Sequence, residues 1–288
     1  MDSGNTQPTY KRQRFLLSFI RQLDGGVSAT DLQKLVFLHT MRERVEYYEF
    51  LPYKFGAYSF QLAEDVNTLR RDGYLTDEGT RVNAAGTYLL DNLFTIETER
   101  GNALLRKAYR EYPYFTINSD MIDTLFSREE AARLKNERQQ YVQTEYALFT
   151  IGYEGLSIEA FINVLIQNGI TLLCDVRLNP LSRKFGFSKG KLEHITGMVG
   201  IKYVHIPDLG IESDKRRSLE TVEDYEDLFA DYAETFPQRK AHLDRVYSLL
   251  CSDIRIALMC FEKDAAMCHR HIIRDFITDE YEVRSKDL

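Results

Sequence analysis

Apolar residues in the first hundred positions recur at helical spacing, between short polar breaks. The first stripe lies within residues 12–23 and ends at Asp24-Gly25-Gly26; it comprises Phe15, Leu16, Phe19, Ile20 and Leu23. Ser28 precedes a second stripe and is a candidate N-cap. Asp31 lies three residues after Ser28, which is a short version of the capping box. We therefore predict two helices, the second of which begins at Ser28.

A third amphipathic segment follows the aromatic stretch around residue 50. It carries Leu62, Val66 and Leu69 and ends at Asp72-Gly73. The turn at residues 77–79, between the apolar residues Leu75 and Val82, predicts a short hairpin. The order of three helices and a hairpin is typical of a winged helix. Its third helix would be the candidate for the DNA major groove, which nominates Gln61, Asn67, Arg70 and Arg71. Acidic residues on the same helix leave docking to a protein as an equal alternative.

The second half has a different pattern, in which short apolar runs alternate with amphipathic helices. The runs predict four strands, at residues 148–151, 171–176, 202–206 and 254–260. Helices are expected at residues 158–167, 189–198, 236–251 and 268–276. This alternation is typical of a doubly wound, mostly parallel α/β fold.

Length and composition are consistent with two folded domains. The chain has 288 residues, of which 44% are hydrophobic and 28% charged. We assign residues 1–99 to the winged-helix-like, mainly α module, residues 100–145 to a charged helical connector, and residues 146–288 to the α/β domain.

The net charge of −7 argues against indiscriminate binding to nucleic acid, although local basic patches can still bind it. The first eight residues lack the features of a secretory signal, and no apolar run is long enough to span a membrane. The four cysteines have no disulfide-framework spacing and are expected to be reduced thiols. We therefore expect a cytoplasmic protein without a membrane partner.

Polar residues follow all four predicted strands, where parallel sheets bind their ligands. Five of them are candidates for proton transfer or other catalytic roles: Glu262, Asp175, His269, Tyr153 and Glu154. Five more are candidates for binding an anionic substrate: Arg177, Asn179, Arg183, Lys189 and Arg270.

Several of these residues have a second interpretation. Asp175 is either a base or the partner of Arg177 in a pair that fixes the loop, and Glu262 is either a catalytic carboxylate or an exposed loop acid. Cys268, at a predicted helix N-terminus beside His269, is a candidate for thiolate chemistry. The cysteine spacing does not fit a zinc ribbon, so we expect neither a metal site nor a cofactor.

Two resemblances accompany these patterns. Residues 32–39, 52–59 and 72–75 resemble the N-terminal part of Panacea-type antitoxin domains, over roughly residues 10–95. Residues 150–155 and 175–183, with Gly186-Phe187-Ser188-Lys189, Cys260-Phe261-Glu262 and Cys268-His269-Arg270, resemble the domain-of-unknown-function family 488, over about residues 147–277. This second resemblance implies the fold and a pocket, but no substrate.

These observations together lead to three functional hypotheses. In the first, the winged-helix module brings the α/β domain to a nucleic acid or nucleotide, with DNA favoured, and that domain hydrolyses or modifies a nucleotide or base. N-glycosidic and phosphoester hydrolysis are both open, in a defence or DNA-processing role. In the second, the protein is a non-enzymatic, ligand-sensing DNA-binding regulator. The third is a thiol-based transferase that uses Cys268. A homodimer is compatible with each of them.

Overall fold

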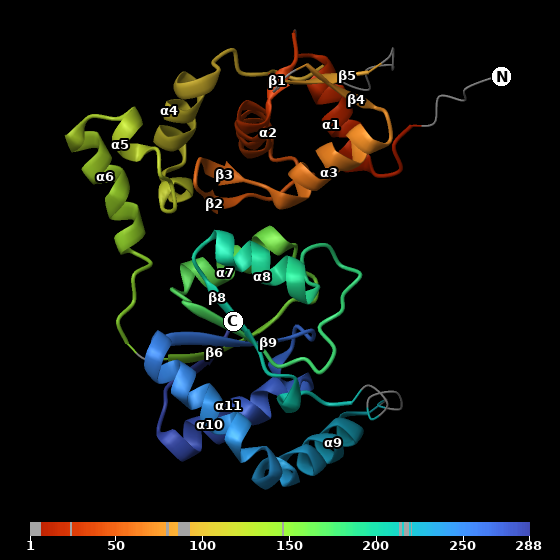
Figure 1. Ribbon diagram of the computed structural model, residues 1–288, viewed down its shortest axis with the longest axis vertical. Coiled ribbons are helices and arrows are strands. Elements are labelled where there is room, and N and C mark those ends of the chain that lie inside the picture. The colour runs from red at the N-terminus through yellow and green to blue at the C-terminus, as the bar shows by residue number, and fades with distance from the viewer. Residues whose placement is uncertain are drawn as a thin grey trace, which may run out of the picture. The chain divides into compact units, whose positions relative to one another are not determined.

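The structure is a computed structural model that describes residues 7–23, 25–78, 81–85, 93–145, 147–212, 215, 219 and 221–288 (Figure 1). The chain divides into two compact units, Met1–Gln140 and Tyr141–Leu288. Both are folded around cores of their own, and the whole is a mixed α/β protein. Among the described residues, no helix is both long enough and apolar enough to cross a membrane. The predicted turn at residues 77–79 lies partly outside the described residues.

The first unit begins with the three predicted helices and the predicted hairpin strands, and it contains three further short strands, β1, β2 and β3. The elements are α1 (Lys11–Arg21), β1 (Val27–Ser28), α2 (Ala29–Glu43), β2 (Leu51–Tyr53), β3 (Gly56–Tyr58), α3 (Phe60–Arg71), β4 (Leu75–Glu78) and β5 (Arg81–Ala84). The Ser28 side chain accepts a hydrogen bond from the backbone N–H of Asp31, which confirms the predicted start of the second helix. Strands β4 and β5 form an antiparallel hairpin, and β5 also pairs with β1.

The segment assigned to a connector contributes to the core of the first unit. It forms α4 (Gly101–Glu111), the 3-10 helix η1 (Pro113–Thr116), α5 (Ile122–Leu125) and α6 (Arg128–Gln139). Leu104, Tyr109, Leu125 and Leu134 are buried in the same cluster as the apolar faces of α1 and α2. The first compact unit therefore extends through α6.

The second unit is built on one parallel sheet with helices on both faces (Figure 1). Its elements are β6 (Ala147–Gly152), α7 (Ile158–Gln167), β7 (Leu172–Asp175), α8 (Lys189–Met198), β8 (Lys202–His205), η2 (Pro207–Leu209), α9 (Val222–Glu234), α10 (Phe236–Asp253), β9 (Arg255–Cys260), η4 (Ala265–Met267), α11 (Arg270–Tyr281) and β10 (Ser285–Asp287). The strand order is β10-β6-β9-β7-β8, and every neighbouring pair is parallel.

The two faces of this sheet are covered differently. Helices α7 and α8 lie over one face, and α10 and α11 lie over the other (Figure 1). On the second face, Leu148, Leu172 and Ile256 of the strands belong to one buried cluster with Leu243, Val246 and Ile273 of the helices. All four predicted strands are present, whereas the short edge strand β10 and helix α9 are additional elements.

Candidate functional site

A cavity of about 410 Å³ lies beyond the carboxyl ends of the central strands. Strands β6, β9 and β7 are neighbours and parallel, so the loops that follow them converge at one edge of the sheet. We call this hollow the strand-end cavity. Its lining residues are Tyr153, Arg177, Leu178, Asn179, Leu181, Ser182, Arg183, Ile211, Cys260, Phe261 and Glu262.

A buried ion pair lies at the end of β7. The Arg177 guanidinium donates through Nε to Asp175 Oδ1 at 2.8 Å and through Nη2 to Oδ2 at 2.6 Å. The hydroxyl of Tyr203 donates to the same carboxylate at 2.6 Å, and the backbone N–H of Arg177 donates to it at 3.1 Å. Burial alone would lower the pKa of Arg177, but the Asp175 carboxylate outweighs it and raises that pKa above its ordinary value. The Arg177 guanidinium is therefore held in its charged form.

This geometry gives Asp175 the second of its two predicted roles. Its carboxylate is fully buried, accepts four hydrogen bonds and is absent from the cavity lining, so it is not placed to exchange protons with a ligand. Arg177 lines the cavity, but its donors serve Asp175, Tyr153 and the Phe187 carbonyl. The pair positions the loop after β7 rather than providing a cation for a substrate.

Tyr153 connects this ion pair to the cavity. Its hydroxyl accepts a hydrogen bond from Arg177 Nη1 at 3.1 Å, which leaves the hydroxyl hydrogen to donate. Its ring stacks on Phe187 with centroids 4.3 Å apart, and Phe261 meets it edge-on at 5.3 Å. These contacts fix the orientation of the phenol at the cavity wall.

Arg270 and Glu154 hold the loop that follows β9. The Arg270 guanidinium is 1% exposed and donates to the carbonyl oxygens of Glu262 at 2.6 Å and Lys263 at 3.1 Å, and to Thr150 Oγ1 at 3.2 Å. The Glu154 carboxylate accepts from the Lys263 backbone N–H at 3.0 Å. Arg270 was predicted to bind a substrate anion, but in the structure its side chain is buried under the loop and its donors serve the protein itself.

The basic loop after β7 supplies the exposed polar groups of the cavity. Arg183 and Asn179, two of the predicted substrate-binding residues, are exposed and line it. Lys189 is exposed, but it lies beside His205 Nδ1 at 3.4 Å and is not among the lining residues. Glu262 is half-buried and is the one carboxylate in the described lining.

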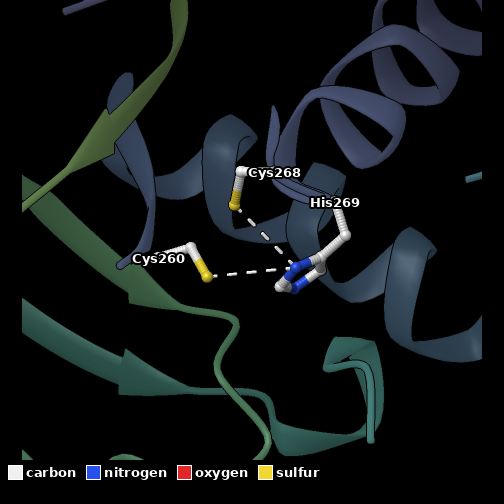
Figure 2. Close-up of side chains that lie close together, drawn as sticks. All are labelled: Cys260, Cys268 and His269. Carbon is white, nitrogen blue, oxygen red and sulfur yellow. Dashed lines mark hydrogen bonds between the residues drawn. The ribbon is translucent and has the colours of Figure 1, made fainter. Parts of the chain in front are cut away.

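His269 forms a buried cluster with two thiols (Figure 2). Its Nδ1 lies 3.9 Å from Cys260 Sγ and 3.9 Å from Cys268 Sγ, while its Nε2 lies 3.2 Å from the carbonyl oxygen of Val176. Each of the three residues is 1% exposed, and His269, which was predicted as a catalytic group, is not among the residues that line the cavity. Burial raises the pKa of Cys268, and the neighbouring Cys260 raises it further. This shift is opposite to the one expected for a reactive thiolate.

The candidate nucleic-acid residues of the first unit lie on α3 and are engaged locally. Arg70 donates to Asn67 Oδ1 at 2.9 Å and forms an ion pair with Asp77 at 2.8 Å. The Arg71 guanidinium lies 3.3 Å from the Asp72 carboxylate, and Gln61 donates to Asp65 at 3.3 Å. Neighbouring acids therefore offset much of the positive charge on this helix.

Comparison with known proteins gives one family match, which covers part of the second unit. The family described as "Domain of unknown function DUF488" matches residues 157–277, which run from the residue before α7 into α11. This match confirms the resemblance of the C-terminal domain. Neither a curated protein nor a solved structure matches the chain. The resemblance of the first unit to Panacea-type domains has no support from these comparisons.

Several residues that the structure brings to the site were not among the predicted site residues, although Leu181, Ser182 and Phe261 lie in the segments that carry the family resemblance. Phe261, Leu181 and Ser182 line the cavity, and Tyr203 donates to Asp175. Phe261 stands directly beside the predicted Glu262, so its position after a strand was a usable signal. Tyr203 gave none, because its contact depends on the pairing of β7 with β8.

Proposed function

We propose that the second unit binds a nucleotide, or another ligand with a nucleobase, in the strand-end cavity and hydrolyses or modifies it. One observation carries this proposal: an exposed aromatic ring, an exposed guanidinium and a half-buried carboxylate line the same cavity. They belong to Phe261, Arg183 and Glu262. A ring that is 45% exposed at a cavity wall offers a stacking surface for a base.

The other two groups suit the rest of such a ligand. A guanidinium binds phosphate through two parallel hydrogen bonds, which favours Arg183 as the phosphate contact. Glu262 is the group for proton transfer, and Tyr153 lines the same cavity as a hydroxyl donor. N-glycosidic and phosphoester hydrolysis both require these functions.

Binding is tested by titrating the full-length protein with nucleoside monophosphates and with the matching nucleosides. Arg183→Ala is expected to weaken binding of the monophosphates by about 10- to 100-fold, the value of a hydrogen bond to a charged group. Nucleoside binding should change little. Phe261→Ala should weaken both ligand classes. Arg245→Ala is the matched control, because Arg245 is exposed on α10 and is not among the cavity lining.

Turnover is tested with Glu262→Gln, which keeps the size of the side chain and removes its charge. The variant should bind the ligand nearly as well as the native protein but lose product formation, followed by chromatography of the reaction mixture. Full activity in Glu262→Gln removes the acid-base role. Native affinity in both Arg183→Ala and Phe261→Ala removes the cavity as the site.

We also propose that the first unit is a winged-helix module that associates with nucleic acid. The supporting observation is the order α1, β1, α2, α3 and the β4–β5 hairpin, with β1 paired to the hairpin. Arg71, with 73% of its side chain exposed, is the residue to test. Arg71→Ala should weaken binding of duplex DNA in fluorescence anisotropy and reduce its salt dependence. No measurable DNA binding at low salt would leave protein docking as the role of the unit.

A regulator without catalysis would use the same two surfaces. Nucleotide-dependent DNA affinity without product formation would favour that alternative over a hydrolase.

A further inference from the structure

The cluster of Cys260, Cys268 and His269 has the composition and spacing of a metal site. One ligand atom from each residue lies within 4.8 Å of the others, and all three side chains are buried. Tetrahedral zinc, with bonds of about 2.3 Å to sulfur and about 2.0 Å to nitrogen, separates S and N ligand atoms by about 3.5 Å. The two Nδ1–Sγ distances of 3.9 Å are slightly longer than this value, so a small adjustment of the side chains would bring the three atoms to a zinc ion.

The imidazole of His269 is already oriented for coordination. Val176 O can only accept a hydrogen bond, so Nε2 at 3.2 Å is the protonated nitrogen that donates to it. In the neutral imidazole, which is the form that binds metal, Nδ1 carries the lone pair, and it faces both sulfurs (Figure 2). A hydrogen bond from the distal nitrogen to a backbone carbonyl is the usual way in which a histidine ligand is held.

The fold explains why spacing in the sequence did not reveal this group. Cys260 is the last residue of β9, and His269 directly precedes α11. The loop between them is folded back by the contacts of Arg270 with the carbonyl oxygens of Glu262 and Lys263. Cys268 is thereby brought beside Cys260, and the N-terminus of the 12-residue helix α11 favours negative charge there.

We infer that Cys260, Cys268 and His269 bind one zinc ion, with a fourth coordination position on the side of the strand-end cavity. Two thiolates and one imidazole are a ligand set that zinc uses in sites with an open position. Cys260 is the member of the three that lines the cavity, so the cavity is the side from which a water or ligand atom reaches the ion. Zinc binding itself does not depend on the proposed nucleotide chemistry.

The test begins with the full-length protein, purified without chelators and analysed for metal by mass spectrometry. One zinc per chain is expected. After chelation, titration with Co²⁺ should give the absorption of thiolate-to-cobalt charge transfer and of a tetrahedral ion. Zn²⁺ affinity is then measured by competition with a chromophoric chelator. Cys268→Ser and His269→Gln should each weaken it by more than about 100-fold, because even outer hydrogen-bond partners of a ligand contribute 10- to 100-fold.

Cys251→Ser is the matched control, since Cys251 is an exposed cysteine on α10 and should leave the affinity unchanged. Circular dichroism shows whether each variant folds; if the ligand variants do not fold, the Co²⁺ spectrum of the native protein still decides. Absence of zinc together with no thiolate-to-cobalt band would overturn the inference. So would a Cys260–Cys268 disulfide in the purified protein, if the reduced form takes up no metal.

The metal site and the proposed function can be overturned independently of each other. Native protein that binds zinc but no nucleotide keeps the metal site and removes the proposed function. Nucleotide binding that is unchanged in Cys268→Ser, with zinc lost, removes the fourth position as part of the ligand site.

Discussion

Gly152, the last residue of β6, lies directly against the backbone of Glu262: a Cβ atom on Gly152 would come within 1.7 Å of the Glu262 carbonyl oxygen. The obstacle is backbone, so it cannot rotate away as a side chain could. Gly152→Ala should therefore displace the loop after β9 and destabilise the protein by about 1–3 kcal/mol, the usual cost of overpacking. Urea denaturation measures the loss, and nucleotide titration shows whether the cavity is damaged.

Gly190→Ala is the control for this prediction. Gly190 lies in α8 with open space around it, so alanine should be neutral or stabilise the helix by up to about 1 kcal/mol. Equal stability of Gly152→Ala and the native protein would contradict the close approach.

Asp175→Asn should be strongly destabilising. It leaves the buried Arg177 guanidinium without its counter-charge, which costs about 3–5 kcal/mol for a buried pair. Tyr203→Phe removes one hydrogen bond to the same carboxylate and should cost about 1 kcal/mol. Denaturant melts of the two variants test this order. A cost for Asp175→Asn no larger than that of Tyr203→Phe would mean that the pair contributes little.

The stability of the first unit should depend on pH through Lys34. This side chain is 1% exposed and donates to the Ala57 carbonyl oxygen at 2.6 Å. Burial lowers its pKa from 10.5 to about 7. Between these two values the unfolded chain binds a proton that the folded chain has lost, so stability rises with pH across this window, by on the order of 5 kcal/mol in total. Below pH 7 the full cost of burying the charge is present.

Lys34→Met isolates this effect, because methionine fills the space of the side chain without titrating. Hydrogen exchange of α2 amides, followed by mass spectrometry at several pH values, gives the opening free energy of native protein and variant after correction for the intrinsic exchange rates. The difference between the two should change across the pH window. A constant difference would show that Lys34 has an ordinary pKa.

Arg270→Lys should release the loop after β9 while leaving the charge in place. Lysine lacks the planar guanidinium that donates to both carbonyl oxygens and to Thr150 Oγ1 at once. Each lost hydrogen bond costs about 1 kcal/mol. We expect lower stability and weaker ligand binding. Because the same contacts bring Cys268 beside Cys260, Zn²⁺ affinity should fall as well. Native Zn²⁺ affinity in this variant would separate the loop from the cluster.

The elements with clear periodicity were predictable from the sequence. Helices α7 and α8 have their predicted bounds, and all four predicted strands lie in the sheet. Strand β10 was missed because Ser285, Lys286 and Asp287 are all exposed and have no apolar alternation. Its place is determined by pairing with β6, a contact between distant parts of the chain.

The site was predictable in its location and less so in the roles of its residues. The convergence of strand ends follows from the parallel sheet, and it brought Tyr153, Arg183 and Glu262 to one cavity. Whether a charged residue beyond a strand is buried depends on neighbours that the sequence does not reveal. Arg270 and Asp175 therefore look like Arg183 and Glu262 in the sequence, yet their side chains are enclosed.

The strand order has a consequence for the way in which the second unit acquires its structure. β6 and β7 do not pair with each other, because β9 lies between them. During synthesis the ribosome must deliver the whole segment through α10 before either strand can obtain its central neighbour. Such late, long-range pairing slows folding and leaves one edge of each of these two apolar strands unpaired in the nascent chain. The nascent chain should therefore be most prone to aggregate, and most dependent on chaperones, until residues 255–260 have emerged.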